Sequence, residues 1–492
     1  MQKRELRRAV FGDESCIGRL PWLNTAVLVY VGVTVAVLTL YLIAPVVTAL
    51  NGTILYSMPS YLGIVGTVLL CVDLFSNKVL WRGPYVWLLY GICLLAVVSS
   101  LRTISYGVKD NLYFLCWAAL DFALLYSVAH RSSEKMLRRF AAWTYGAALV
   151  PWTAACCVSL GQYVLQIGYS YVSDPQADAS LTRQGFVENR LFGVFNPLNH
   201  AAYVSLMLLL IGLYYILRTK KPLLRAALIV ADVVLFLHVM LSNSRSAMIA
   251  MWICAVVIAA LLVRSRVTST RWKRNLAALG AAVLMAAVCV PVYTGIREVA
   301  GHVPYWVGTA QDRPGQPNGE EDLLRREGLE DDTSNNRFAI WKSYLALHKD
   351  IGLTGLSPGN YMAYIRENHP ENYLVKYIRD TFPEKYEAGL IYHVHNGYLM
   401  VYVSTGLLGF GLLVAFLLLC VVRVFRYLHR HPETDPEMMI AMTVVIAGGV
   451  AAFFDKGIFF MDNTPAALFW IAAGYVMKKA AAEKRLPEKK DS

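Results

Sequence analysis

The sequence predicts an all-α polytopic membrane protein, with about 12 transmembrane helices and a large extracytoplasmic helical loop between spans 9 and 10. Of its 492 residues, 57% are hydrophobic and only 16% are charged, and the mean hydropathy is +0.45. Soluble domains carry about a quarter charged residues. Apolar runs also recur along most of the chain, and basic residues gather in alternate loops between them. Together these observations exclude an ordinary soluble domain.

A spanning helix needs about 20 mostly apolar residues. Twelve apolar runs are near this length, and the last is the shortest. They cover residues 22–48, 59–76, 84–101, 111–129, 140–166, 197–217, 223–241, 246–264, 275–293, 396–421, 437–455 and 463–477.

These runs divide the chain into four parts. They are nine N-terminal transmembrane helices over 1–293, an extracytoplasmic loop with short helices over 294–395, three C-terminal transmembrane helices over 396–477, and a basic cytoplasmic tail over 478–492.

The distribution of lysine and arginine predicts the orientation. Cytoplasmic loops carry an excess of these residues. If both termini are cytoplasmic, basic clusters such as 131–139 and 264–274 lie inside, and the short outward loops are nearly free of them. The net charge of +12 therefore reflects topology and does not indicate nucleic-acid binding. The nine cysteines show neither a disulfide framework nor metal-ligand spacing.

The 294–395 loop is predicted to combine a mobile part with short helices. Residues 309–334 are rich in Gly, Pro and charged residues, which is typical of mobile segments. Ser334 is predicted to cap a helix with Arg337, Trp341, Tyr344 and Leu345 on one face. Two further helices are predicted, at about 360–368 and 371–379.

Residues 392–399 concentrate polar groups at a predicted outer membrane boundary, where ionisable side chains are costly to desolvate. His393 and His395 have an ordinary pKa suited to proton transfer near neutrality. Their spacing puts them on different sides of a helix, so at most one would face a cavity. Asn396 can orient His395 or a substrate. Interfacial anchoring is the alternative interpretation.

Three outward arginines are candidates for anion binding. Arg245 stands among serines at the outer end of two spans, which indicates a polar pocket for an anionic ligand or a buried acid; snorkelling is the alternative. Arg337 and Arg190 lie on the two longer outward segments, where salt bridges to loop carboxylates are the alternative. Three arginine forks facing one cavity would hold a diphosphate without a metal.

Other ionisable residues support weaker interpretations. Acids in or near the spans can mark a proton pathway or pair between helices; they are Asp73, Asp121 and Asp232. A local ion pair accounts for the cluster in the last outward turn, which comprises Asp455, Lys456 and Asp462. The two histidines lack a third ligand at metal spacing, and nucleotide-binding and DxD motifs are absent from the sequence.

The order of the motifs resembles the O-antigen ligase and O-antigen polymerase superfamily of bacteria over about residues 185–425. The motifs are Arg190-x-x-Gly193 with Asn196-Pro197-x-Asn199, Ser244-Arg245-Ser246-Ala247, Asn336-Arg337-x-x-x-Trp341 leading to Gly352-x-x-Gly355, and His395-Asn396-Gly397-Tyr398-Leu399 with Gly406-Leu407-Leu408-Gly409.

The resemblance implies a GT-C-like, metal-independent glycosyltransferase of the bacterial cytoplasmic membrane that needs no cofactor. Its donor would be a glycan on undecaprenyl diphosphate, used at the outer face, and its partners would be a glycan or lipid-anchored acceptor, the bilayer and other surface-polysaccharide assembly proteins. Arg245 and Arg337 would bind the leaving diphosphate, and His395 would deprotonate the acceptor. The implied substrate-binding residues are Arg190, Asn199, Asn396, Trp341 and His393.

Three functions remain open at this point. A polymerase would use the next lipid-linked repeat unit as acceptor, and a ligase would use a lipid A-core-type acceptor. The sequence favours the polymerase or a related capsule-type enzyme, because nothing in it indicates a lipid A-core acceptor. A flippase or transporter is the alternative from another class, but transporters often show two related halves, and no half-repeat is evident here.

Overall fold

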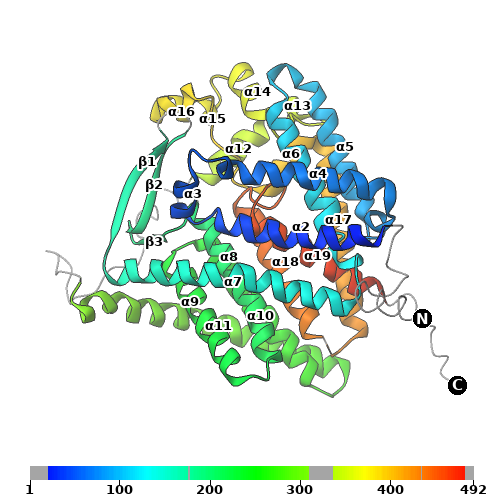
Figure 1. Cartoon of the computed structure of the whole chain (residues 1–492), viewed down its shortest axis with the longest axis vertical. Helices are drawn as coiled ribbons and strands as arrows, with labels where there is room; N and C mark the ends of the chain where they lie inside the picture. The colour runs from blue at the N-terminus through cyan, green and yellow to red at the C-terminus, as the bar shows by residue number, and fades with distance from the viewer. Residues whose placement is uncertain (1–19, 175–177, 310–335, 434, 483–492) are drawn as a thin grey trace.

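The computed structural model describes residues 20–174, 178–309, 336–433 and 435–482. Long helices dominate the described chain (Figure 1). Most of the predicted mobile segment 309–334, the predicted cap Ser334 and the tail beyond residue 482 lie outside these ranges.

The helices before the large loop include short 3-10 turns and one π-helical segment. They are α2 Pro21–Leu40, α3 Ala44–Leu50, η2 Ile54–Ser57, α4 Met58–Ser76, η3 Val79–Trp81, α5 Val86–Arg102, η4 Ile104–Tyr106, α6 Lys109–Ala119, η5 Leu120–Leu125, η6 Val128–His130, α7 Glu134–Val164, α8 Leu198–Arg218, α9 Pro222–Leu241, α10 Arg245–Arg266 and α11 Arg271–Val307.

The large loop contributes short helices, and three long helices follow it. The short ones are α12 Arg337–Ala346, α13 His348–Ile351, α14 Tyr361–Asn368, α15 Tyr373–Thr381 and α16 Pro383–Glu387; the long ones are α17 Gly397–Arg430, α18 Pro436–Phe454 and α19 Thr464–Ala481. The two helices predicted at about 360–368 and 371–379 are therefore present as α14 and α15.

The predicted fold class, a helical polytopic membrane protein, is confirmed. Each of the twelve predicted runs coincides with helix, and within the described residues ten helices are long and apolar enough to cross a membrane. The helix α5 is shorter, with 17 residues, and α19 is not among the ten. The count of twelve spans therefore stays a prediction.

Two boundaries differ from the prediction. The run 22–48 is not one helix: α2 ends at Leu40 and α3 begins at Ala44. The chain breaks there because the backbone around Ile43 bridges Phe195, with the Ala44 amide donating to the Val194 carbonyl at 2.8 Å. In addition, α11 continues past residue 293 to Val307, into the segment predicted as loop.

A small antiparallel sheet, which the sequence did not predict, occupies the outward segment after α7. Its strands are β1 Gly168–Asp174, β2 Asp178–Val187 and β3 Arg190–Gly193, in the order β1-β2-β3. Glu188 and Asn189 join β2 to β3, and their φ angles of 51° and 55° match the left-handed turn that two-residue hairpins favour. Figure 1 shows the sheet at the edge of the helices, and β2 contacts α16.

The acids inside the helices have different surroundings. Asp73 is fully buried and pairs with the buried Arg131 at 2.5 Å, which supports pairing between helices for this residue. Asp121 lies within electrostatic range of Asp462. Neither carboxylate oxygen of Asp232 has a hydrogen-bond partner in the part of the chain that the structure describes.

Two glycine motifs join the large loop to α17. The backbone of the loop after α13 runs against a kink in α17, where the Leu356 amide donates to the Val403 carbonyl at 2.8 Å and the Leu407 amide donates to the Gly352 carbonyl at 3.1 Å. Gly406 forms the kink with φ 69° and ψ −168°, a conformation that is essentially restricted to glycine. The sequence spacing of these motifs therefore serves docking of the loop on the membrane helices.

Gly406→Ala should destabilise the fold by at least about 2 kcal/mol, because alanine is strained in this conformation. A Cβ at this position would also lie 2.3 Å from the Leu353 backbone. Thermal unfolding in detergent would measure the loss. Gly411→Ala in the same helix is the matched control, because a Cβ there meets nothing within 4 Å. Equal unfolding temperatures for the two variants would show that the kink is not needed.

Candidate active site

His395 lies in the extended segment that precedes α17, and α12 holds this segment in place. The Trp341 indole Nε1 donates to the Val394 carbonyl at 3.1 Å, and the Tyr344 hydroxyl donates to the Tyr392 carbonyl at 2.6 Å. Both side chains come from the helix face predicted at Arg337, Trp341 and Tyr344. This face therefore fixes the backbone on both sides of His393.

Asn396 begins α17 as its N-cap. Its Oδ1 accepts from the Leu399 amide at 2.9 Å, as asparagine commonly does at this position. His395 itself has φ 46°, a left-handed conformation that is uncommon outside glycine and often occurs at functional sites. The cap and the strained residue together turn the chain sharply between the extended segment and the helix.

Charged groups from α12 and from the turn after α18 surround His395. Burial lowers the pKa of His395; the Asp455 carboxylate opposes this shift, and the charges of Arg337 and Lys456 reinforce it. Arg337 is the first residue of α12, and its guanidinium lies over the Phe454 ring at 5.7 Å. The result is a neutral imidazole near neutral pH, between a carboxylate and two cations.

His393 has a different environment from His395. Its Nδ1 is 3.2 Å from the Lys456 Nζ, from which it accepts a hydrogen bond when Lys456 is charged. Burial and the Lys456 charge hold the pKa of His393 well below its usual range. The two imidazole rings are 6.3 Å apart and nearly perpendicular. One nitrogen of His393 is thus already engaged by Lys456, and the Asp455 carboxylate favours proton uptake by both imidazoles.

The turn between α18 and α19 contributes residues to the site that sequence reasoning missed. His200 Nε2 lies 3.5 Å from Asp455 Oδ2. Burial raises the pKa of Asp455, but the hydrogen bond and charge of His200 and the charge of His395 outweigh it, so the carboxyl stays below its usual pKa. The Asp455 carboxylate is therefore ionised at neutral pH.

A local ion pair accounts for this turn only in part: Lys456 lies within electrostatic range of Asp455 and Asp462, but each charged side chain also has a distant partner. Asp455 contacts His200, Lys456 contacts His393, and Asp462 accepts from the Tyr113 hydroxyl. The sequence did contain one sign that this turn belongs to a functional site, which is the presence of three ionisable residues in one short outward turn. Their partners lie tens to hundreds of positions away, so spacing alone could not identify them.

Arg190 and Asn199 lie in a second polar group, beside the N-terminus of α10. Arg190 donates to the Asn199 Oδ1 and to the Ser242 carbonyl, both at 3.4 Å. The Ser244 hydroxyl donates to the same Asn199 oxygen at 3.1 Å. Arg245 follows Ser244 directly as the first residue of α10. The structure therefore brings the predicted Arg190, Asn199 and Arg245 to one place.

A further arginine, which the sequence did not single out, adjoins this group. Arg297 on α11 is buried, and its guanidinium donates to Asn243 Oδ1 at 3.3 Å and lies over the Tyr293 ring. Sequence reasoning missed it because residue 297 fell in the segment predicted as polar loop. The continuation of α11 explains how it reaches Asn243.

The helix α8 connects the two polar groups. Asn199 belongs to the Arg190 group, and its neighbour His200 contacts Asp455 in the His395 group. One turn later, the Tyr203 hydroxyl lies beside Ser246 and within electrostatic range of Asp455 and Arg337. Among the described residues, no group of three or more His, Cys, Asp or Glu side chains is placed to hold a metal ion. The assembled groups can bind an anion and accept a proton.

Comparison with known proteins identifies one family. Residues 230–414 match the family model described as O-antigen ligase. The match includes Arg245, Arg337 and His395 but ends before Asp455 and begins after Asn199. No curated protein and no solved structure matches the chain. Over residues 230–414 this chain is therefore similar to the O-antigen ligase family, within a helical chain that has several helices long and apolar enough to cross a membrane.

Proposed function

We propose that the protein is a metal-independent glycosyltransferase that moves a glycan from undecaprenyl diphosphate to an acceptor hydroxyl at the outer face of the bacterial cytoplasmic membrane. The observation that carries this proposal is the position of His395 within electrostatic range of Arg337 and Asp455, inside the O-antigen ligase match. The outer placement, with both termini cytoplasmic, rests on the basic loops predicted at the opposite ends of the helices.

His395 is the proposed general base. It takes the proton of the acceptor hydroxyl as that oxygen attacks the anomeric carbon, which gives a new glycosidic bond with inversion. The bond between the anomeric carbon and the diphosphate oxygen breaks, and the diphosphate leaves with the electron pair. The neutral imidazole favoured by its surroundings is the protonation state that this step needs.

Arg245 and Arg337 are proposed to hold the diphosphate and stabilise the negative charge that develops as it leaves. Guanidinium groups suit this task because they are always charged and bind phosphate with two parallel hydrogen bonds. Arg190 and Asn199 extend the same polar surface towards the donor. Trp341, His393 and Asn396 lie around the His395 turn, where they hold its conformation and border the substrate.

The acceptor distinguishes polymerase from ligase. Purified protein should elongate a lipid-linked repeat unit if it is a polymerase, and should modify a lipid A-core-type acceptor if it is a ligase; we favour the polymerase. Release of undecaprenyl diphosphate should be the same with and without EDTA. Loss of activity in EDTA that Mg²⁺ restores would contradict a metal-independent reaction. Glycan-lipid movement across vesicles without any new glycosidic bond would instead indicate a flippase.

The pH dependence should reflect the lowered pKa of His395. A general base must be neutral, so the rate should fall only as the pH drops through that pKa, which lies below the ordinary value of about 6.5. Asp455→Asn removes the charge that raises this pKa, so the acid limb of the pH–rate profile should move to lower pH. Asp350→Asn, in the loop beside His369, is the control and should leave the limb in place. A limb that moves to higher pH in Asp455→Asn would contradict the assignment.

A further inference from the structure

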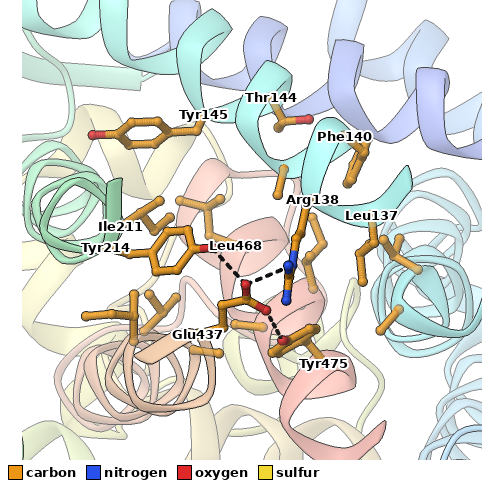
Figure 2. Close-up of a pocket in the computed structure, with 18 of the residues that line it drawn as sticks. Leu137, Arg138, Phe140, Thr144, Tyr145, Ile211, Tyr214, Glu437, Leu468 and Tyr475 are labelled. Carbon is orange, nitrogen blue, oxygen red and sulfur yellow. Dashed lines mark hydrogen bonds and ion pairs between the residues drawn. The ribbon is translucent and has the colours of Figure 1, made fainter. Parts of the chain in front are cut away.

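Helices α2, α7, α8, α18 and α19 surround a cavity of about 230 Å³ that the proposed transfer reaction does not use (Figure 2). Its wall is mostly aliphatic, with side chains such as Leu137, Ile211 and Leu468. Its polar mouth includes Glu437, near the start of α18, whereas Asp455 follows the end of that helix. The 18 positions between them correspond to about 27 Å of helix, so cavity mouth and candidate active site lie at opposite ends of the bundle.

One carboxylate joins four helices at the mouth of this cavity. Glu437 on α18 accepts from Arg138 on α7, Tyr214 on α8 and Tyr475 on α19, each at 2.8 Å (Figure 2). Arg218, at the end of α8, lies 3.9 Å from the same carboxylate. The two arginines therefore share one partner, and each keeps donors for another anion.

The ion pairs around this mouth are partly accessible. Their cations are Arg138, Arg218 and Lys479, and their carboxylates are Glu437, Glu134 and Asp435. The side chains of Arg138, Arg218 and Glu134 are 50%, 55% and 57% exposed. Exposed groups of both signs match a headgroup that carries both signs.

Two unpartnered hydroxyls line the cavity. Thr144 and Tyr145 are 6% and 7% exposed, and within the described chain neither hydroxyl has a hydrogen-bond partner. Buried hydroxyls are usually hydrogen-bonded. Thr144 lies six residues beyond Arg138 on α7, or about 9 Å further along the helix. The Tyr145 hydroxyl is within electrostatic range of Asp232, outside the cavity lining, so Thr144 is the hydroxyl that indicates a ligand with an acceptor oxygen a short distance from its charged end.

We propose that the cavity binds a glycerophospholipid with an ethanolamine headgroup from the leaflet at this end of the helices. Its phosphate contacts Arg138 and Arg218, its ammonium contacts Glu134, and an ester carbonyl accepts from Thr144. The cavity takes part of one acyl chain, because its wall is mostly aliphatic.

Thermal unfolding of the purified full-length protein in phospholipid-free detergent tests this assignment. Added dioleoyl phosphatidylethanolamine should raise the unfolding temperature in a saturable manner, because it binds the folded state. Dioleoyl phosphatidylglycerol should require at least about tenfold more lipid for the same effect, since its headgroup has no ammonium to contact Glu134. Arg138→Gln should weaken phosphatidylethanolamine binding by about tenfold through loss of a charge-assisted contact.

Two further variants address the cavity itself. Ala472→Phe places a ring in the space and should abolish the response to phosphatidylethanolamine, whereas Ala154→Phe, on an exposed face of α7 away from the cavity, should keep it. If Ala472→Phe does not fold, Thr144→Val, which keeps the shape and removes the hydroxyl, should weaken the response. Equal stabilisation by the two lipids, or an unchanged response in Ala472→Phe or Thr144→Val, would overturn the proposal.

Discussion

Replacement of His395 by alanine is expected to reduce the rate of glycosyl transfer by about 10²–10⁴-fold, the usual contribution of a general base. The acceptor hydroxyl would then lose its proton to water, which is not positioned for the task. The loss should appear mainly in kcat, because the base acts in the transition state and contributes little to donor binding. Release of undecaprenyl diphosphate from a purified lipid-linked donor, with acceptor present, measures the effect.

His393→Ala is the matched comparison, because the two imidazoles are neighbours on the same segment. The Nδ1 of His393 contacts Lys456, so this variant should lower the rate by less than about tenfold, through disturbance of the site. The opposite ranking, with His393→Ala inactive and His395→Ala active, would assign the base to His393. If both variants have similar unfolding temperatures, the difference between their rates reflects catalysis and not a loss of folding.

Arg337→Ala is expected to lower kcat by about 10²–10³-fold, a loss typical of removing one group that stabilises charge in the transition state. Arg337→Lys should recover part of this loss, because lysine keeps the charge but lacks the planar fork that binds phosphate with two hydrogen bonds. The same donor-release assay measures both variants.

Arg379→Ala provides the control for Arg337. Arg379 belongs to the same loop, on α15, and its partners are the exposed Glu371 and Asp380. Exposed ion pairs contribute little, so this variant should retain activity within about twofold. A loss in Arg379→Ala equal to that in Arg337→Ala would mean that loop charge in general, and not a defined diphosphate contact, supports the reaction.

Much of the fold could be predicted because hydrophobic runs and basic loops are local signals. The shared face of Arg337, Trp341 and Tyr344 followed from helical periodicity, which wrongly added the exposed Leu345, and α14 and α15 were predicted after the Gly and Pro residues that break the chain. The break after Leu40 could not be predicted, because it depends on pairing between Ile43 and Phe195, 152 positions apart. The sheet was missed because its segment was treated only as an outward loop, although Glu188 and Asn189 form a recognisable hairpin turn.

The candidate site, like the fold, could be predicted only where the signals are local in the sequence. The motifs around Arg245, Arg337 and His395 could be recognised in order, but their order does not reveal which charges meet. His200 and Asp455 are 255 positions apart and contact each other beside the His395 turn. Asn396 was assigned to substrate from its position beside His395, yet its Oδ1 caps α17. Such roles depend on tertiary contacts that a single sequence does not encode locally.

An experimental structure of the protein with a lipid-linked diphosphate glycan bound would test the central claim most directly. We expect guanidinium nitrogens of Arg245 and Arg337 within about 3 Å of the diphosphate oxygens. We also expect a His395 nitrogen within about 3 Å of the acceptor hydroxyl once an acceptor is added. A structure that places His395 more than about 15 Å from both arginines, with no loop motion to join them, would contradict the catalytic assignment, since proton transfer requires hydrogen-bond contact.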